Sequence, residues 1–250
     1  MKVCLAGTAS SKDLVYSNPL PKFLLESFYS IKEWQIPVIK QCELFLLDSG
    51  AFSFMNSAKK GVEITEKDFD EYLDKYINFI NKYDIKYFFE LDIDVIVGYD
   101  KVLELRKKLE EETGKKCIPV FHKNRGIKEW IKMCKEYDYV AIGTSGKNDS
   151  KWTRTHPEVL YKMLKIAKEN NCKVHGLGYT SMTGLTKLHF YSVDSTTWQE
   201  GSRFGVVHLF DGKTVQKIHN KDRSLRTVKT INEHNYPQWL KFQDYADKHL

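Results

Sequence analysis

The sequence predicts an α/β protein that folds as a single (β/α)₈ barrel, the TIM-barrel fold. Three observations support this prediction. The chain has 250 residues, a typical length for such a barrel. Short apolar runs alternate with longer amphipathic stretches from one end of the chain to the other. Most of the runs end in polar or small residues, as barrel strands do where they reach an active site.

Eight apolar runs are predicted to be buried parallel strands because they are short and rich in β-branched or aromatic residues. They are Val3–Ala6, Leu44–Leu47, Tyr87–Leu91, Cys117–Phe121, Tyr139–Ile142, Lys173–Leu177, Phe190–Val193 and Gly205–Phe210. Pro119 weakens the fourth run, since proline cannot donate to a sheet ladder. Eight strands favour closure into a barrel. A doubly wound open sheet is the alternative, and no GxGxxG follows the first run to support a dinucleotide-binding version of it.

Amphipathic patterns between the runs predict the covering helices. Apolar residues recur at three- and four-residue steps in Glu66–Tyr83, with Thr65 as its cap and Asp68 in its first turn. Gly114 suits the end of a helix, and Pro157 suits the start of one. The remaining predicted helices are Asp100–Thr113, Ile127–Tyr137, His156–Asn170, Thr183–Leu188 and Pro237–His249.

One domain is expected, with the barrel over residues 1–212 and a basic stretch with the C-terminal helix, 213–250, packed on it. The net charge is +6, from 39 Lys and Arg against 33 Asp and Glu. Basic side chains concentrate after residue 212 and would attract a phosphate backbone through counterion release. A solvated basic tail is the alternative. The predicted nucleic-acid-binding residues are Lys213, Lys217, Lys221, Arg223 and Arg226.

The five cysteines are widely spaced and include no CxxC pair, so neither a disulfide framework nor a cysteine-based zinc site is indicated. A reducing compartment fits this pattern. The N-terminal apolar run is too short for a signal peptide, and no run approaches the length of a membrane span. A cytoplasmic protein is therefore expected.

The ends of the predicted strands nominate candidate site residues without any motif. They are Asp48, Asp92, His122, Thr144, Gly178 and Asp194. Three carboxylates at one barrel mouth repel one another and are typical of a catalytic site. A facing pair of carboxylates is what glycosyl transfer requires, one as nucleophile and one as general acid/base. Zinc binding by His122, Asp92 and His175 is an alternative, although no HxH or HExxH spacing supports it.

Five segments resemble the site segments of tRNA-guanine transglycosylases, in order along the chain. Asp48-Ser49-Gly50-Ala51-Phe52 is similar to the family's Asp-Ser-Gly-Gly-Tyr/Phe motif. The resemblance spans roughly Val3 to Phe210. It is closest to the small, phage-type members and to the related deoxypurine-in-DNA transglycosylases. The other four segments are Phe89–Asp94, Ala141–Gly146, His175–Thr180 and Ser192–Thr196.

The resemblance implies a TIM-barrel enzyme that exchanges guanine in DNA or tRNA for a 7-deazaguanine base, without a cofactor. It implies Asp194 as the nucleophile on C1′ and Asp48 as the general acid/base. Phe52 would stack on the base, in a loop shared with Ser49 and Gly50. Asp92, or else Asp94, would bind the Watson–Crick edge of the base. The remaining implied base contacts are Gly143, Thr144, Ser145, Gly178 and Tyr179.

The chain departs from the family in one respect. The tRNA enzymes hold a structural zinc through three cysteines and a histidine near the C-terminus, and this chain has no cysteine after Cys172. No zinc-binding subdomain and no metal are therefore expected, which leaves DNA open as the polymer. The target base would have to be flipped out of its stack. Two further functions remain open: a base-releasing N-glycosidase on the same scaffold, and a nucleic-acid-binding barrel without catalysis.

Overall fold

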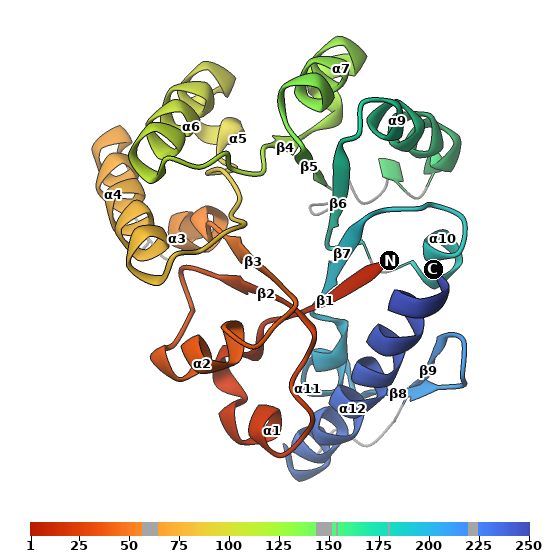
Figure 1. Ribbon diagram of the computed structural model, residues 1–250. Helices are drawn as coiled ribbons and strands as arrows, with labels where there is room; N and C mark the ends of the chain where they lie inside the picture. Colours follow the sequence, from red (N-terminus) through yellow and green to blue (C-terminus); the bar gives the residue numbers. More distant parts are fainter. Residues whose placement is uncertain (57–64, 144–151, 154, 180, 220–224) are drawn as a thin grey trace.

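A computed structural model describes residues 1–56, 65–143, 152–153, 155–179, 181–219 and 225–250. The fold is a mixed α/β structure with a seven-stranded parallel sheet in the order β3-β2-β1-β7-β6-β5-β4 (Figure 1). The strands are β1 (Lys2–Ala6), β2 (Phe23–Ser27), β3 (Leu44–Asp48), β4 (Val120–Phe121), β5 (Tyr139–Gly143), β6 (Lys173–Leu177) and β7 (Ser192–Ser195).

The sheet curls into a TIM-like half-barrel and is not a regular closed eight-stranded barrel. Residues 87–90 lie between the two edge strands but form isolated bridges rather than a strand. Leu47 of β3 bridges to Phe88, and Phe89 bridges to Ile118, just before β4. Proline at 119 explains part of this irregularity, because it has no N–H to donate and β4 keeps just two residues.

The structure differs from the predicted strands in three places: Tyr87–Leu91 forms bridges rather than a strand, the eighth strand lies elsewhere, and one strand was not predicted. The predicted eighth strand does not join the parallel sheet, because β8 (Val206–Phe210) pairs antiparallel with β9 (Val215–His219) in a separate hairpin. Strand β2 lies between β1 and β3 in the sheet, and it was not predicted from the sequence. The hairpin runs across residue 212, so it connects the two parts into which the sequence was divided.

The helices surround the sheet (Figure 1). Thr65 and Asp68 form a reciprocal capping box at the start of α4, and Gly114 ends α6 in the left-handed conformation, as predicted. The helices are α1 (Lys12–Tyr16), α2 (Ile36–Ile39), α3 (Ala51–Asn56), α4 (Glu66–Tyr83), α5 (Asp94–Val97), α6 (Tyr99–Thr113), α7 (Gly126–Glu136), α9 (Pro157–Glu169), α10 (Met182–Leu185), α11 (Glu200–Phe204) and α12 (Leu225–His249). Short 3₁₀ turns are η1 (Thr8–Ser10), η2 (Glu33–Gln35), η3 (Lys123–Arg125) and η4 (Thr197–Gln199).

The C-terminal helix α12 is longer than predicted and contains Pro237 in its interior. Tyr236 and Trp239 are buried on either side of the proline, so packing holds the helix through it. The Gln243 side chain donates to the carbonyls of Val3 and Phe23, at 2.7 and 2.8 Å. These bonds fix α12 near the amino ends of β1 and β2, and leave the opposite end of the sheet for the site.

Two apolar clusters form the core. The larger lies between the sheet and its helices. The smaller contains residues of the strands and their flanking segments but none from a helix, so it fills the inner face of the curled sheet. None of the described helices is long and apolar enough to cross a membrane.

Candidate active site

The loop after β3 holds Asp48 in a tight turn. Gly50 adopts a left-handed conformation with φ 68°, and its backbone N–H donates to Asp48 Oδ2 at 3.0 Å. A Cβ at position 50 would lie 2.4 Å from Ser27 Oγ and 2.6 Å from Tyr29 Cβ. Glycine is therefore required here both for the turn and for the close approach of β2.

Asp48 lies at the end of β3 in an environment that disfavours its charged form. Burial raises the pKa of Asp48 to about 6; the hydrogen bond from Gly50 opposes the rise, and the charges of Asp194 and Asp92 add to it. Asp194 and Asp92 thus both lie within electrostatic reach of Asp48. A carboxyl group with a pKa near 6 can both give and take a proton close to neutral pH.

Two tyrosines of α4 hydrogen-bond to the backbone of β3 and the loop after it. Tyr72 donates its hydroxyl to the Ser49 carbonyl at 2.6 Å, and Tyr76 donates to the Leu47 carbonyl at 3.0 Å. Ser49 itself is buried, so its side chain packs within the loop. Phe54 stacks on Tyr72, whereas the side chain of Phe52 is 69% exposed. Phe52 is therefore not a core residue, and its predicted stacking on a base stays a prediction.

Asp194 occupies the third position of β7, and its side chain is inside the curled sheet. Its Oδ1 accepts a hydrogen bond from the Gly178 backbone N–H at 2.6 Å. His175 Nε2 lies 3.2 Å from the same oxygen. Gly178, which the resemblance implied as a base contact, thus holds the predicted nucleophile in place.

The other ring nitrogen of His175 points to polar side chains inside the curled sheet. Its Nδ1 lies 2.6 Å from Ser192 Oγ, and Ser192 in turn bonds to the Tyr139 hydroxyl. His175 and Ser192 are fully buried. Ser192 opens one of the five site segments but no role was predicted for it, and Tyr139 was not predicted as a site residue. Their signal is strand alternation, because Ser192 and Asp194 are two residues apart and must face the same side.

Asp92 lies across the mouth and pairs with a histidine from the end of β4. His122 Nε2 is 2.7 Å from Asp92 Oδ1. The imidazole lies directly on Gly143, where an added Cβ would come within 2.6 Å of the ring. Gly143 is therefore needed so that His122 can reach Asp92.

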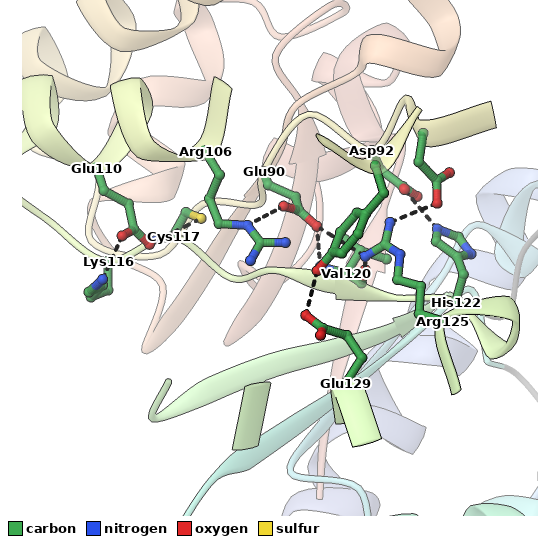
Figure 2. A network of polar contacts seen from close by, with 12 residues as sticks. Glu90, Asp92, Arg106, Glu110, Lys116, Cys117, Val120, His122, Arg125 and Glu129 are labelled. Atoms are coloured by element: carbon green, nitrogen blue, oxygen red, sulfur yellow. Dashed lines mark hydrogen bonds and ion pairs between the residues drawn. The ribbon is translucent and has the colours of Figure 1, made fainter. Parts of the chain in front are cut away.

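A buried network of acids and arginines adjoins this pair (Figure 2). Glu90 is fully buried, accepts from Arg106 Nε at 2.6 Å and accepts from the Val120 N–H at 2.7 Å. Arg125 lies near it and bonds to Asp94 Oδ2 at 2.8 Å. Burial raises the pKa of Glu90, although both arginines oppose the rise. Asp94, the alternative base-binding residue, is therefore engaged by a cation.

The zinc alternative does not assemble as the sequence suggested, because His175 lies with Asp194 rather than with His122. The donor atoms of Asp92, Asp94 and His122 do lie within 4.8 Å of one another. However, Arg125 already pairs with Asp94, so a divalent cation would have to compete with a guanidinium at hydrogen-bond distance.

The other predicted site residues fall in three groups. Tyr179 is buried and packs against Phe190, with ring centroids 5.1 Å apart. Lys213 is exposed on the hairpin turn, whereas Lys217 pairs with Glu200 at 2.8 Å and so has a counter-charge. Outside the described residues lie Thr144, Ser145, Lys221, Arg223 and the side chain of Arg226.

Comparison with models of protein families gives no match, and a search of curated proteins gives none either. The chemistry of this site therefore has to be argued from its own geometry.

Proposed function

We propose that this chain is a nucleic-acid guanine transglycosylase, which exchanges guanine for a 7-deazaguanine base in DNA or tRNA. One observation carries the proposal: Asp48 and Asp194 lie at the carboxyl-end side of β3 and β7 in one parallel sheet, and a backbone N–H binds each of them. The order of the five sequence segments supports it. The proposal includes a (β/α)₈ barrel in which residues 87–90 take the place of one strand, and a cytoplasmic location.

The proposed reaction is a double displacement. Asp194 attacks C1′ of the target nucleotide and forms an ester bond, while the bond from C1′ to guanine N9 breaks. The electron pair of that bond stays with guanine, and Asp48 donates a proton to the departing base. In the second half, Asp48 removes the N9 proton of the incoming base. N9 then attacks C1′, and the ester bond to Asp194 breaks.

Other groups at the mouth fit the binding of a flat, polar base. Phe52 is an exposed aromatic ring at the second position of α3. Asp92 offers a carboxylate to the N–H groups on the Watson–Crick edge of guanine. His122 fixes the orientation of that carboxylate through their 2.7 Å contact. We propose that Lys213 and the basic residues that follow it contact the phosphate backbone.

Labelled guanine tests this proposal. The wild-type chain is expected to incorporate it into a guanine-containing DNA or tRNA. Asp194→Asn should reduce incorporation at least about 10⁴-fold, as expected for the loss of a covalent nucleophile. Asp244→Asn is the matched control, since Asp244 lies on α12 and pairs with Lys22 at 2.8 Å, away from the mouth. Exchange that survives in Asp194→Asn would contradict the assignment, and abasic sites without incorporation would indicate a base-releasing hydrolase.

A further inference from the structure

A file of four polar side chains crosses the otherwise apolar interior of the curled sheet. It runs from Tyr139 on β5 through Ser192 on β7 and His175 on β6 to Asp194. The exposed fractions of the first three are 6%, 0% and 0%. Branched apolar side chains dominate the interiors of such barrels, so a buried polar file needs an explanation.

The number of available hydrogens determines which group donates in each hydrogen bond of the file. Its three links need three hydrogens, and the Tyr139 hydroxyl, the Ser192 hydroxyl and one ring N–H of His175 supply three. Burial raises the pKa of Tyr139, which favours the protonated hydroxyl as a donor. Tyr139 then donates to Ser192, Ser192 donates to His175 Nδ1, and His175 Nε2–H donates to Asp194. An imidazolium would supply a fourth hydrogen and leave one hydroxyl hydrogen without an acceptor within the file.

The direction of hydrogen-bond donation along the file determines which oxygen of Asp194 is available to react. Oδ1 receives two donors, the Nε2–H of His175 and the N–H of Gly178. Oδ2 accepts no hydrogen bond from the residues that the structure describes, and the Asp194 side chain is 11% exposed. The carboxylate is thus held through one oxygen, and the described residues donate no hydrogen bond to the other.

We propose that His175, oriented by Ser192, is a positioning residue that fixes Asp194 so that Oδ2 forms the bond to C1′. This inference rests on the proposed function. Ser192 sets the tautomer of His175, and the tautomer decides whether a hydrogen or a lone pair faces Asp194. With the other tautomer, the Nε2 lone pair would face Oδ1 and repel the carboxylate.

Two variants that each remove one buried oxygen separate positioning from structural support. Ser192→Ala deprives Nδ1 of its donor and frees His175 to change tautomer. Tyr139→Phe leaves Ser192, His175 and Asp194 still linked. We expect kcat for guanine exchange to fall about 10- to 100-fold in Ser192→Ala, as for other partners of a reacting group, with KM for guanine nearly unchanged. Tyr139→Phe should lower kcat roughly two- to threefold.

Nitrogen-15 NMR of the histidine rings gives a readout that is independent of activity. The wild-type chain and Tyr139→Phe should show His175 with hydrogen on Nε2, and Ser192→Ala should show population of the Nδ1–H form. An Nδ1–H tautomer or an imidazolium in the folded wild-type chain would overturn the inference. Equal kcat in both variants and the wild type would overturn it too. A chain with the expected tautomer that exchanges no guanine would instead refute the proposed function, and the positioning role with it.

Discussion

The two sides of the strand-end mouth hold their carboxylates in different ways. Around residues 87–94, Glu90 and Asp94 are paired with Arg106 and Arg125. At the ends of β3 and β7, backbone N–H groups bind Asp48 and Asp194, and within the described residues neither forms an ion pair with a lysine or arginine. The first arrangement neutralises buried charge within the protein.

In the second arrangement, burial raises the pKa of Asp48 to about 6, and the charges of Asp194 and Asp92 add to the rise. An acid that is not tied to a cation can change its charge during a reaction, whereas one locked to an arginine stabilises a local fold. The carboxylates that look uniform in sequence therefore differ in how they are held: arginines pair with Glu90 and Asp94, whereas backbone N–H groups bind the two acids that we propose to react.

After Asp194→Asn, the largest effect is expected for Asp48→Asn. It should slow the single-turnover formation of the sugar–protein adduct about 10²- to 10⁴-fold, the usual range for loss of a general acid. In the wild-type chain this step needs the protonated acid, so its rate should fall as pH rises above about 6, the pKa of Asp48. The variant should lose this pH dependence. A wild-type rate that rises with pH through this range would contradict the role of Asp48 as the acid.

Next is Arg106→Met, on the other side of the mouth. It leaves the buried Glu90 without its 2.6 Å partner and should lower the free energy of unfolding by about 3–5 kcal/mol, measured in urea. The double variant Glu90→Gln with Arg106→Met should recover much of this loss, because no buried charge then lacks a partner. If both proteins unfold at the wild-type midpoint, the network is not structural and the comparison fails.

A smaller effect is expected at Glu26, a buried acid outside the mouth. The Thr8 N–H donates to it at 2.7 Å, and burial raises its pKa to about 7. Because the pKa is higher in the folded chain than the usual 4.5, stability should decline as pH rises from about 5 through 7. Glu26→Gln should remove this decline. The effect of the substitution on the free energy of unfolding should therefore be more favourable at pH 8 than at pH 5, by up to about 3 kcal/mol.

Exposed Glu43→Gln is the control for that measurement and should leave the pH dependence of unfolding unchanged. Guanine exchange should also be unaffected in Glu26→Gln. Loss of exchange in this variant would mean that a raised pKa by itself does not distinguish the mouth from other buried acids.

Local sequence signals predicted the helices better than the strands. The span of α4 and its capping box follow from short-range periodicity and capping, which the chain encodes locally. Strand β2 was missed because Glu26 interrupts its apolar run and resembles a surface residue, although Thr8 donates two hydrogen bonds to its Oε1. The run before Asp211-Gly212 was assigned to the barrel, yet an Asp-Gly pair between apolar stretches is a strong hairpin signal.

The candidate site was predictable in part. Strand ends nominated Asp48, Asp92 and Asp194 because carboxyl ends of parallel strands share one edge. The partners of these acids were harder to predict, since they depend on strand register. His175 meets Asp194 only because β6 and β7 are neighbours with His175 opposite Ser192. Arg106 reaches Glu90 from a helix that sequence periodicity places on the outside of the sheet.

Mapping the covalent adduct tests the central claim most directly. The chain is incubated with a guanine-containing oligonucleotide, quenched and denatured, and its peptides are analysed by mass spectrometry. We predict a sugar ester on Asp194, whose Oδ1 is the oxygen held by Gly178 and His175 and whose Oδ2 would carry the sugar. Attachment to Asp48 or Asp92, or turnover without any adduct under conditions that trap one in a known double-displacement enzyme, would contradict the account.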